Sequence, residues 1–229
     1  MAVTQGVKLK DHTVLALDIG TRFLKIAELR LARGAISLLT VAVSPTPPGV
    51  VDSNQILDPV GLGRAIKSMM ATHKIRTRKA IVSISGQSSV VVRPIDLPKM
   101  SVKELTDTMR FEVERHIPFT ADEVVMDYAP IIDPDELPDD ETNMKVLLAV
   151  AQEELIKSYL KTIAVAGLQP VALDVEILAS IRALVDIHQR TNQLDNTLAL
   201  VSIGAVSTDI SIVNQGNLIF TRSVPIAGD

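Results

Sequence analysis

Apolar residues near the N-terminus form three short runs that are separated by turn-forming residues. The run at 14–17 leads into an Asp-Ile-Gly-Thr sequence at 18–21, which predicts a strand that enters a glycine loop. Two further apolar runs lie at 24–29 and 35–43, and Gly34 between them suits a turn. The pattern therefore predicts a strand, a loop, a second strand, a turn and a third strand.

The middle of the chain predicts a small subdomain placed between parts of a larger one. Helical spacing at 59–73 and a buried strand at 79–86 come first. Ser101 and Glu104 then form a Ser-x-x-Glu capping box, which marks the start of a helix. From Val90 to Val175 we expect a strand at 90–98, a helix at 101–116, strands at 123–131 and 144–152, a helix at 153–167 and a strand at 168–176. This β-α-β-β-α-β order is typical of a compact inserted subdomain, and a helix at 177–189 follows it.

The end of the chain repeats the pattern of its beginning. Superposing the first hairpin on residues 198–213 aligns Gly20 with Gly204 and Asp18 with Ser202. Both segments consist of an apolar strand, a short glycine loop with Ser or Thr, and a second apolar strand. Each then turns at another glycine into a third strand. The repeat predicts a duplicated fold whose two glycine hairpins face each other across one pocket.

Paired hairpins of this kind suit the binding of a polyphosphate from two sides. Glycine allows the backbone to approach a ligand closely. The turn N–H groups and the hydroxyls of Thr21, Ser207 and Thr208 can bind phosphate oxygens. Either hairpin alone is also an ordinary glycine turn, so the phosphate hypothesis depends on the pair.

Composition narrows the class of protein. The 229 residues are 47% hydrophobic and 22% charged, which is typical of a globular chain with a sizeable core. A formal net charge of -4 argues against a general nucleic-acid binder, because such proteins depend on clustered Lys and Arg. The absence of cysteine excludes disulfides and thiolate metal sites, and the four histidines have no metal-ligand spacing.

The first residues, MAVTQGVKLKDHT, have no apolar core of the kind that a secretory signal needs. No apolar run approaches the roughly 20 residues of a membrane span. We therefore expect no direct membrane insertion, and any membrane association to pass through a partner.

At this level of detail the chain resembles a known superfamily, that of actin, Hsp70 and the sugar kinases. The first loop with Lys25 beyond it looks like the first phosphate motif of that superfamily, and SIGAVSTDISIV, which begins at Ser202, looks like the second. More specifically, the chain resembles the PilM family of actin-like proteins of type IV pilus assembly from about Val14 to Asp229. The segments that carry this resemblance are 44–58, 83–98, 109–128, 147–176 and 221–229.

The resemblance implies an actin-like α/β ATPase fold, with a ribonuclease-H-like lobe, an inserted subdomain and a second lobe. We expect the first part of lobe I with its phosphate hairpin at 1–87, the inserted β-α-β-β-α-β subdomain at 88–172, the connecting strand and helix of lobe I at 173–195, and the second phosphate hairpin at 196–229. The family continues into helices and an adenosine-binding motif, so we expect a truncated form that lacks most of lobe II.

The same resemblance implies a function in the cytoplasm, at the face of the inner membrane. PilM-like proteins bind the short cytoplasmic N-terminal segment of the membrane protein PilN and so join the pilus alignment complex, which serves twitching motility. The resemblance also implies ATP and Mg²⁺ as ligands. Whether the chain forms a homo-oligomer or ring is left open by the sequence.

The resemblance also assigns roles to single residues. Asp18 is expected to hold Mg²⁺ through water, and Glu176, at a strand-to-helix junction, to position metal or water, so both are candidate catalytic residues. The residues expected to contact the phosphates are Gly20, Thr21, Arg22, Lys25, Gly204, Ser207 and Thr208. The alternatives are a turn-capping Asp18, a Glu176 carboxylate stabilised by the helix dipole, and solvated charges on an exposed strand.

One departure from the superfamily bears on catalysis. Actin-fold proteins usually have Asp in the second loop, where this chain has Ser202. A missing carboxylate disfavours metal and water positioning, so we expect at most a weak ATPase. Two other functions stay open, namely an FtsA-like division protein and a scaffold with a vestigial nucleotide pocket. A small-molecule kinase is disfavoured because the inserted subdomain is of the wrong kind.

Overall fold

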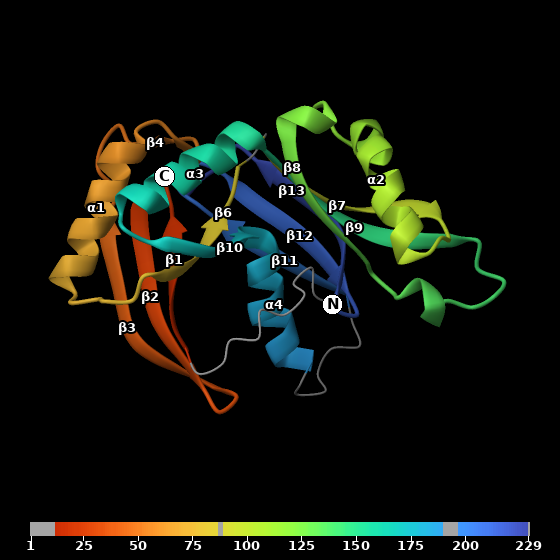
Figure 1. The fold of residues 1–229 in the computed structure, drawn as a ribbon, viewed down its shortest axis with the longest axis horizontal. Coiled ribbons are helices and arrows are strands. Elements are labelled where there is room, and N and C mark those ends of the chain that lie inside the picture. Colours follow the sequence, from red (N-terminus) through yellow and green to blue (C-terminus); the bar gives the residue numbers. More distant parts are fainter. Residues whose placement is uncertain (1–11, 87–88, 190–196, 229) are drawn as a thin grey trace.

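The largest sheet combines four strands from the first part of the chain with one strand from residues 169–175. A computed structural model describes residues 12–86, 89–189 and 197–228 (Figure 1). The sheet has the order β10-β6-β1-β2-β3, in which β1, β2 and β3 are antiparallel and β6 runs parallel to β1 and β10. Its strands are β1 (His12–Ile19), β2 (Phe23–Ala32), β3 (Ala35–Pro45), β6 (Lys79–Ile84) and β10 (Gln169–Val175). The three antiparallel strands predicted at the N-terminus are confirmed.

Two helices, α1 (Pro59–Thr72) and α3 (Glu153–Val165), pack together over this sheet. Asp58 caps the N-terminus of helix α1, and its carboxylate accepts hydrogen bonds from the N–H groups of Val60 and Gly61. Alternate residues of β1 and β2 point into the core that the helices cover, which places apolar positions of period two against apolar helix faces. Members of this core include Leu15, Leu17, Leu24, Ile26, Leu62, Ile66, Tyr159 and Ile163.

A second, three-stranded sheet has the order β7-β9-β8 and carries helix α2 (Val102–His116). Its strands are β7 (Val90–Pro98), β8 (Val124–Pro130) and β9 (Asn143–Gln152), with short 3₁₀ turns at Ala121–Glu123 and Pro134–Glu136. The predicted capping box is confirmed, because Ser101 and Glu104 exchange both capping hydrogen bonds. Apolar residues of α2, among them Leu105 and Met109, pack against this sheet in a core of its own.

The grouping of elements between Val90 and Val175 differs from the prediction. All six elements occur in the expected order, but β10 hydrogen-bonds to β6 in the large sheet, and α3 contributes Tyr159 and Ile163 to the core of that sheet. Only β7, α2, β8 and β9 form a separate sheet with its own core. The apolar pattern gives the type of each element and cannot indicate which sheet a strand joins. The domain limits as such stay predictions.

The third sheet, with the order β11-β12-β13, repeats the N-terminal hairpins. Its strands are β11 (Thr197–Ile203), β12 (Thr208–Asn214) and β13 (Asn217–Val224). Its second turn has positive φ at Gln215 (48°) and Gly216 (80°), and the corresponding first-lobe turn has positive φ at Arg33 (51°) and Gly34 (77°). Both are therefore two-residue turns with the left-handed backbone that suits tight hairpins. The duplication inferred from the sequence extends to the backbone of the turns.

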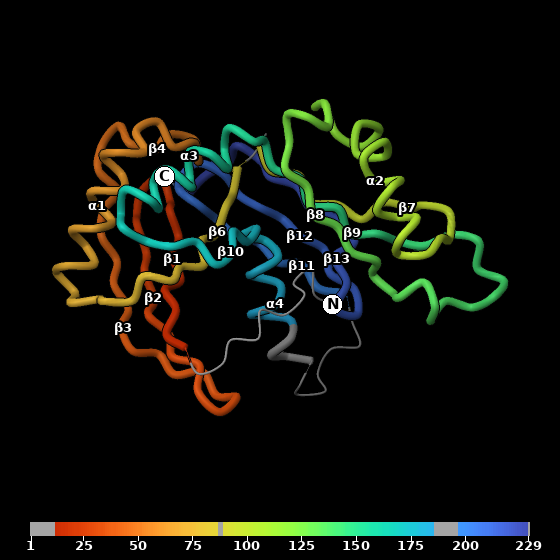
Figure 2. Tube along the Cα trace, in the orientation of Figure 1, coloured from red at the N-terminus to blue at the C-terminus, as the bar shows by residue number. Residues whose placement is uncertain are grey.

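Helix α4 (Glu176–Gln189) connects the large sheet to the third sheet, and the third sheet meets the second through β13 and β7 (Figure 2). Leu178, Ile181 and Val185 of α4 join a core with Val213 and Leu218 of the third sheet. This packing holds the second hairpin beside the C-terminal ends of β1 and β10. A short hairpin of β4 (Val51–Asp52) and β5 (Gln55–Ile56) lies nearby.

Candidate functional site

The two glycine hairpins make the same turn. The Gly20 N–H donates to the carbonyl of Phe23 at 3.0 Å, and the Gly204 N–H donates to the carbonyl of Ser207 at 2.8 Å. A Cβ atom on either glycine would lie 2.9 Å from that same carbonyl oxygen, which is closer than side chains tolerate. Glycine is therefore required at both positions by the tightness of the turn, and the superposition of Gly20 on Gly204 is correct in three dimensions.

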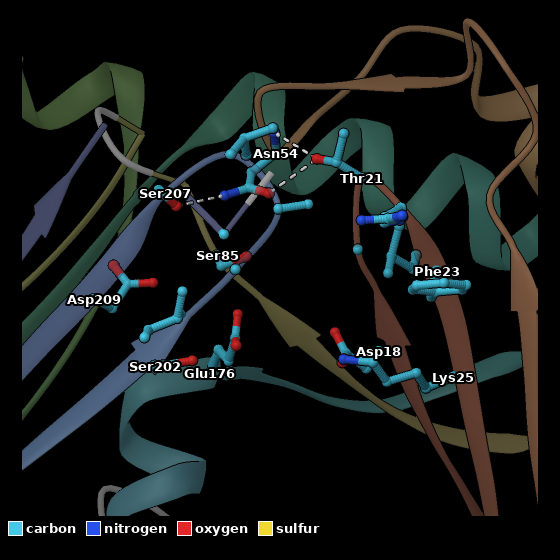
Figure 3. Close-up of a pocket in the computed structure, with 18 residues that line it drawn as sticks. Asp18, Thr21, Phe23, Lys25, Asn54, Ser85, Glu176, Ser202, Ser207 and Asp209 are labelled. Carbon is cyan, nitrogen blue, oxygen red and sulfur yellow. Dashed lines mark hydrogen bonds and ion pairs between the residues drawn. The ribbon is translucent and has the colours of Figure 1, made fainter. Parts of the chain in front are cut away.

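Both turns line a single cavity of about 350 Å³. This volume lies within the usual range for small-ligand pockets, about 300–1,000 Å³. The predicted site residues that line the cavity are Asp18, Gly20, Thr21, Arg22, Lys25, Glu176, Gly204 and Ser207. The prediction that the hairpins share one pocket is thus confirmed (Figure 3).

Thr208 is the one predicted phosphate contact that does not line the cavity. Its hydroxyl donates to the carbonyl of Ile226 at 2.6 Å, and its side chain is buried. Neighbouring residues of a strand point to opposite faces. Because Asp209 lines the cavity, the Thr208 side chain faces the other side, and its role as a phosphate ligand stays a prediction that this geometry does not favour.

Asp18 stands at the end of β1 and is held by two neighbours. One carboxylate oxygen accepts from the Lys25 ammonium at 2.9 Å, and the other accepts from the Ser83 hydroxyl at 3.3 Å. Lys25 is the cross-strand partner of Asp18 in the β1–β2 pair. The hydrogen bond from Lys25 to Asp18 raises the pKa of the lysine, and the negative charge of Glu176 adds to the effect. The pair leaves a cation and a carboxylate together at the cavity wall.

Glu176 is the first residue of α4 and lies half-buried at the cavity. Burial raises its pKa above the ordinary glutamate value, and repulsion from Asp18 and Asp209 raises it further. A hydrogen bond with the Ser85 side chain and the charge of Lys25 act in the opposite direction. A carboxyl group with a raised pKa in a cavity is typical of functional sites.

The structure adds three residues to the predicted site: Asn54, Ser85 and Asp209. Asn54 contacts both hairpins, Ser85 bonds to Glu176, and Asp209 is the cross-strand partner of Ser202. The repeat contained a signal for Asp209, since aligning Gly20 with Gly204 also aligns Lys25 with Asp209. No sequence signal indicated Asn54 or Ser85, which come from other segments.

The cavity residues fit phosphates better than they fit a metal held by protein alone. Among the described residues, no group of three or more His, Cys, Asp or Glu is arranged to hold a metal ion. Mg²⁺ usually takes one or two carboxylates and completes its shell with water and substrate phosphates. Asp18 can supply such a carboxylate, while turn N–H groups, hydroxyls, Arg22 and Lys25 can meet phosphate oxygens. The donor set therefore suits Mg²⁺ together with a polyphosphate.

Comparison with known proteins identifies the family of the chain and a similar solved structure. The sequence model of the family described as type IV pilus assembly protein PilM matches residues 16–229. A solved structure described as a PilM-PilN type IV pilus biogenesis complex is 32% identical to this chain, with a TM-score of 0.82. The similarity covers 94% of this chain and 62% of that chain. This chain thus spans less than two thirds of the length of the protein it matches.

More distant structures share the fold alone. The cytoplasmic domain of EpsL, an inner-membrane component of the type II secretion system of Vibrio cholerae, is 9% identical with a TM-score of 0.54, over 93% of this chain and 71% of that chain. The ethanolamine utilization protein EutJ from Carboxydothermus hydrogenoformans is 15% identical with a TM-score of 0.51, over 95% and 53%. Together with the first similarity, they confirm the actin-like α/β fold predicted from the sequence.

Proposed function

The chain belongs to the PilM family of type IV pilus assembly proteins, and from this we propose that it is an ATP-binding adaptor that holds the cytoplasmic N-terminal segment of an inner-membrane, PilN-like partner. The observation that carries the proposal is the similarity to a PilM-PilN complex, which extends over nearly all of this chain at 32% identity. In this proposal the protein acts at the cytoplasmic face of the inner membrane, within the pilus alignment complex. No helix among the described residues is long and apolar enough to cross a membrane.

We place the partner site on the β7-β9-β8 sheet or at its seam with the large sheet. Strand β8 is an edge of that sheet, so its outer side has no neighbouring strand there among the described residues. Its residue Val125 is 48% exposed. An extended peptide can add to such an edge through main-chain hydrogen bonds, with alternate side chains in pockets. This geometry supports a short, extended partner segment.

The partner proposal is tested with a synthetic peptide of the cytoplasmic segment from the PilN-like protein of the same organism. We expect saturable changes in backbone amide signals, measured by NMR, within residues 90–152 and at the adjoining end of β6. A peptide of scrambled sequence is the matched control. Absence of saturable changes, or changes confined to β3 and α1, would contradict the proposal.

The nucleotide part of the proposal follows from the donor set of the cavity. Lys25, Arg22 and the turn N–H groups would hold the phosphates, and Asp18 would bind Mg²⁺ through water. The metal, when bound, neutralises phosphate charge and orients the terminal phosphate. Glu176, with its raised pKa, would hold a proton or a water at the cavity. These assignments support binding, with slow turnover at most.

A scaffold with a vestigial pocket is the second candidate, and one observation favours it. Asp18, the expected Mg²⁺ residue, is already paired with Lys25 at 2.9 Å, so metal binding has to compete with an ion pair. Lys25→Ala tests this, because it frees the Asp18 carboxylate while removing a phosphate contact. If the adaptor proposal holds, Mg-ATP affinity falls in this variant. If the pocket is vestigial, neither form binds Mg-ATP.

A further inference from the structure

Asn54 is bonded to both glycine hairpins at once. Its side-chain oxygen accepts from the Thr21 hydroxyl at 3.2 Å, and its backbone N–H donates to the Thr21 oxygen at 3.4 Å. Its side-chain Nδ2 donates to the Ser207 hydroxyl oxygen at 3.4 Å. Figure 3 shows Asn54 between these two residues at one end of the cavity. One side chain thus connects the first hairpin to the second.

The turn that carries Asn54 is anchored at its base. Asn54 and Ser53 are the two central residues of the β4–β5 hairpin, with φ values of 62° and 47°. Asn tolerates this left-handed conformation better than most residues do. The base of the hairpin is fixed because Val51 is buried and the Leu57 N–H donates to the carbonyl of Val50 at 2.9 Å. The Asn54 side-chain amide therefore lines the cavity from the β4–β5 hairpin, which is separate from both glycine hairpins.

The direction of the hydrogen bonds at Asn54 determines whether the Thr21 and Ser207 hydroxyls can donate a hydrogen bond to a ligand. Ser207 is buried, and its oxygen receives an N–H from Asn54, so its own proton stays available for another acceptor. Phosphate oxygens only accept hydrogen bonds, and they need such a proton. Asn54 thus leaves Ser207 as a donor toward the cavity, while it ties Thr21 to the same amide.

We propose that Asn54 is a positioning residue of the phosphate site, which holds the two hairpins at a fixed separation and orients the Ser207 hydroxyl as a phosphate donor. Only the orientation of Ser207 toward phosphate rests on the proposed nucleotide binding. The connection between the two hairpins is a property of the ligand-free protein. In the bound protein, the triphosphate meets hairpins that are already in place, so less ordering is needed on binding.

The variant Asn54→Gly removes the amide and keeps the turn, because glycine adopts positive φ freely. The matched control is Ser53→Gly, at the neighbouring positive-φ position, whose hydroxyl contacts the exposed Asp52. Asn54→Asp is the informative third variant. Its carboxylate can accept from both hydroxyls and so keep the hairpins joined, but it turns the Ser207 proton away from the cavity and repels phosphate.

The first measurement is amide hydrogen exchange of residues 204–208 without ligand. We expect Asn54→Gly to exchange about fivefold to tenfold faster than the wild type, where tenfold corresponds to about 1.4 kcal/mol of local opening. Asn54→Asp and Ser53→Gly should stay within about twofold of the wild type. Equal exchange rates of these amides in Asn54→Gly and Ser53→Gly would show that Asn54 does not hold the two hairpins together.

The second measurement is Mg-ATP affinity from NMR titration. We expect a loss of about fivefold for Asn54→Gly, a larger loss for Asn54→Asp and no change for Ser53→Gly. A variant that merely loosened the fold would show both faster exchange and weaker binding of Mg-ATP. Asn54→Asp should lose affinity for Mg-ATP without faster exchange. Unchanged affinity in Asn54→Asp would refute the orienting role. A wild type that does not bind would refute the nucleotide proposal instead, and the exchange result would still decide whether Asn54 joins the hairpins.

Discussion

Glu176 shares the cavity with the carboxylates of Asp18 and Asp209, so the folded protein is less stable when Glu176 is ionised. Its pKa is raised by burial and by repulsion from Asp18 and Asp209. The folded protein therefore keeps a proton at Glu176 at pH values where the unfolded chain has lost it. Stability falls as the pH rises from the unfolded to the folded pKa, and the loss is complete above both.

We expect Glu176→Gln to be more stable than the wild type at neutral pH, because the amide carries no charge and can still accept a hydrogen bond from Ser85. The gain should shrink as the pH falls and vanish below the ordinary glutamate value of 4.5. Urea unfolding at several pH values measures this. If the stability difference between Glu176→Gln and the wild type does not change with pH, ionisation of Glu176 is not what destabilises the wild type.

Ser202 bears on turnover, since the superfamily resemblance predicts a carboxylate at this position. The structure places Asp209 directly across from it, so the second hairpin has a carboxylate on the neighbouring strand. We expect Ser202→Asp to leave the rate of phosphate release from ATP within about threefold of the wild type, because a second acid beside Asp209 adds repulsion. A rise of about tenfold, roughly 1.4 kcal/mol of barrier, would instead identify a disabled catalytic site.

Most cavity residues could be predicted because they lie within the two repeated motifs. Two cavity residues that the sequence did not predict, Asn54 and Ser85, lie outside these motifs. Asn54 reaches the cavity from a separate hairpin, and Ser85 from the end of β6, so only tertiary packing brings them there. Thr208 shows that a motif does not give the side-chain direction, because its neighbour Asp209 lines the cavity and adjacent residues of a strand point to opposite faces.

Helices α1 and α3 meet at Gly63, and their contact positions the elements behind the first hairpin. A Cβ atom at Gly63 would lie 2.6 Å from the Cβ atom of Val165 and 2.7 Å from the carbonyl oxygen of Thr162. Gly63→Ala should therefore force the helices apart, at a cost of about 1–3 kcal/mol in the free energy of unfolding. Chemical denaturation measures this. Ser68→Ala, on the exposed face of α1, is the control, with an expected change within about 0.5 kcal/mol. Equal stability of the two variants would show that the contact adapts.

The elements themselves could be predicted more fully than their grouping. Period-two alternation and the capping box at Ser101 give the type and order of nearly every element, and the structure agrees. The apolar pattern could not show that α3 and β10 pack with the large sheet, because an amphipathic helix can bury its apolar face on either sheet. Their place is decided by the pairing of β10 with β6 and by the contact of α3 with α1.

The three sheets together bring the two hairpins to one cavity, although Gly20 and Gly204 are 184 positions apart in the sequence. Most of what lines the cavity is suited to phosphate. Phe23 is the single aromatic residue among the described residues of the lining, and the Arg22 guanidinium lies 5.7 Å from the centre of its ring. Because little surface is offered to a base, we expect this chain to bind Mg-ATP more weakly than about 1 µM.

The central claim is that the two hairpins act as one phosphate site, and an NMR titration of the 229-residue chain with Mg-ATP tests it most directly. The backbone amide signals of Gly20 and Thr21 should move together with those of Gly204 and Ser207, and all four should fit one dissociation constant. Mg²⁺ alone is the control. Signal changes confined to one hairpin, separate dissociation constants for the two, or no change at either would contradict the claim.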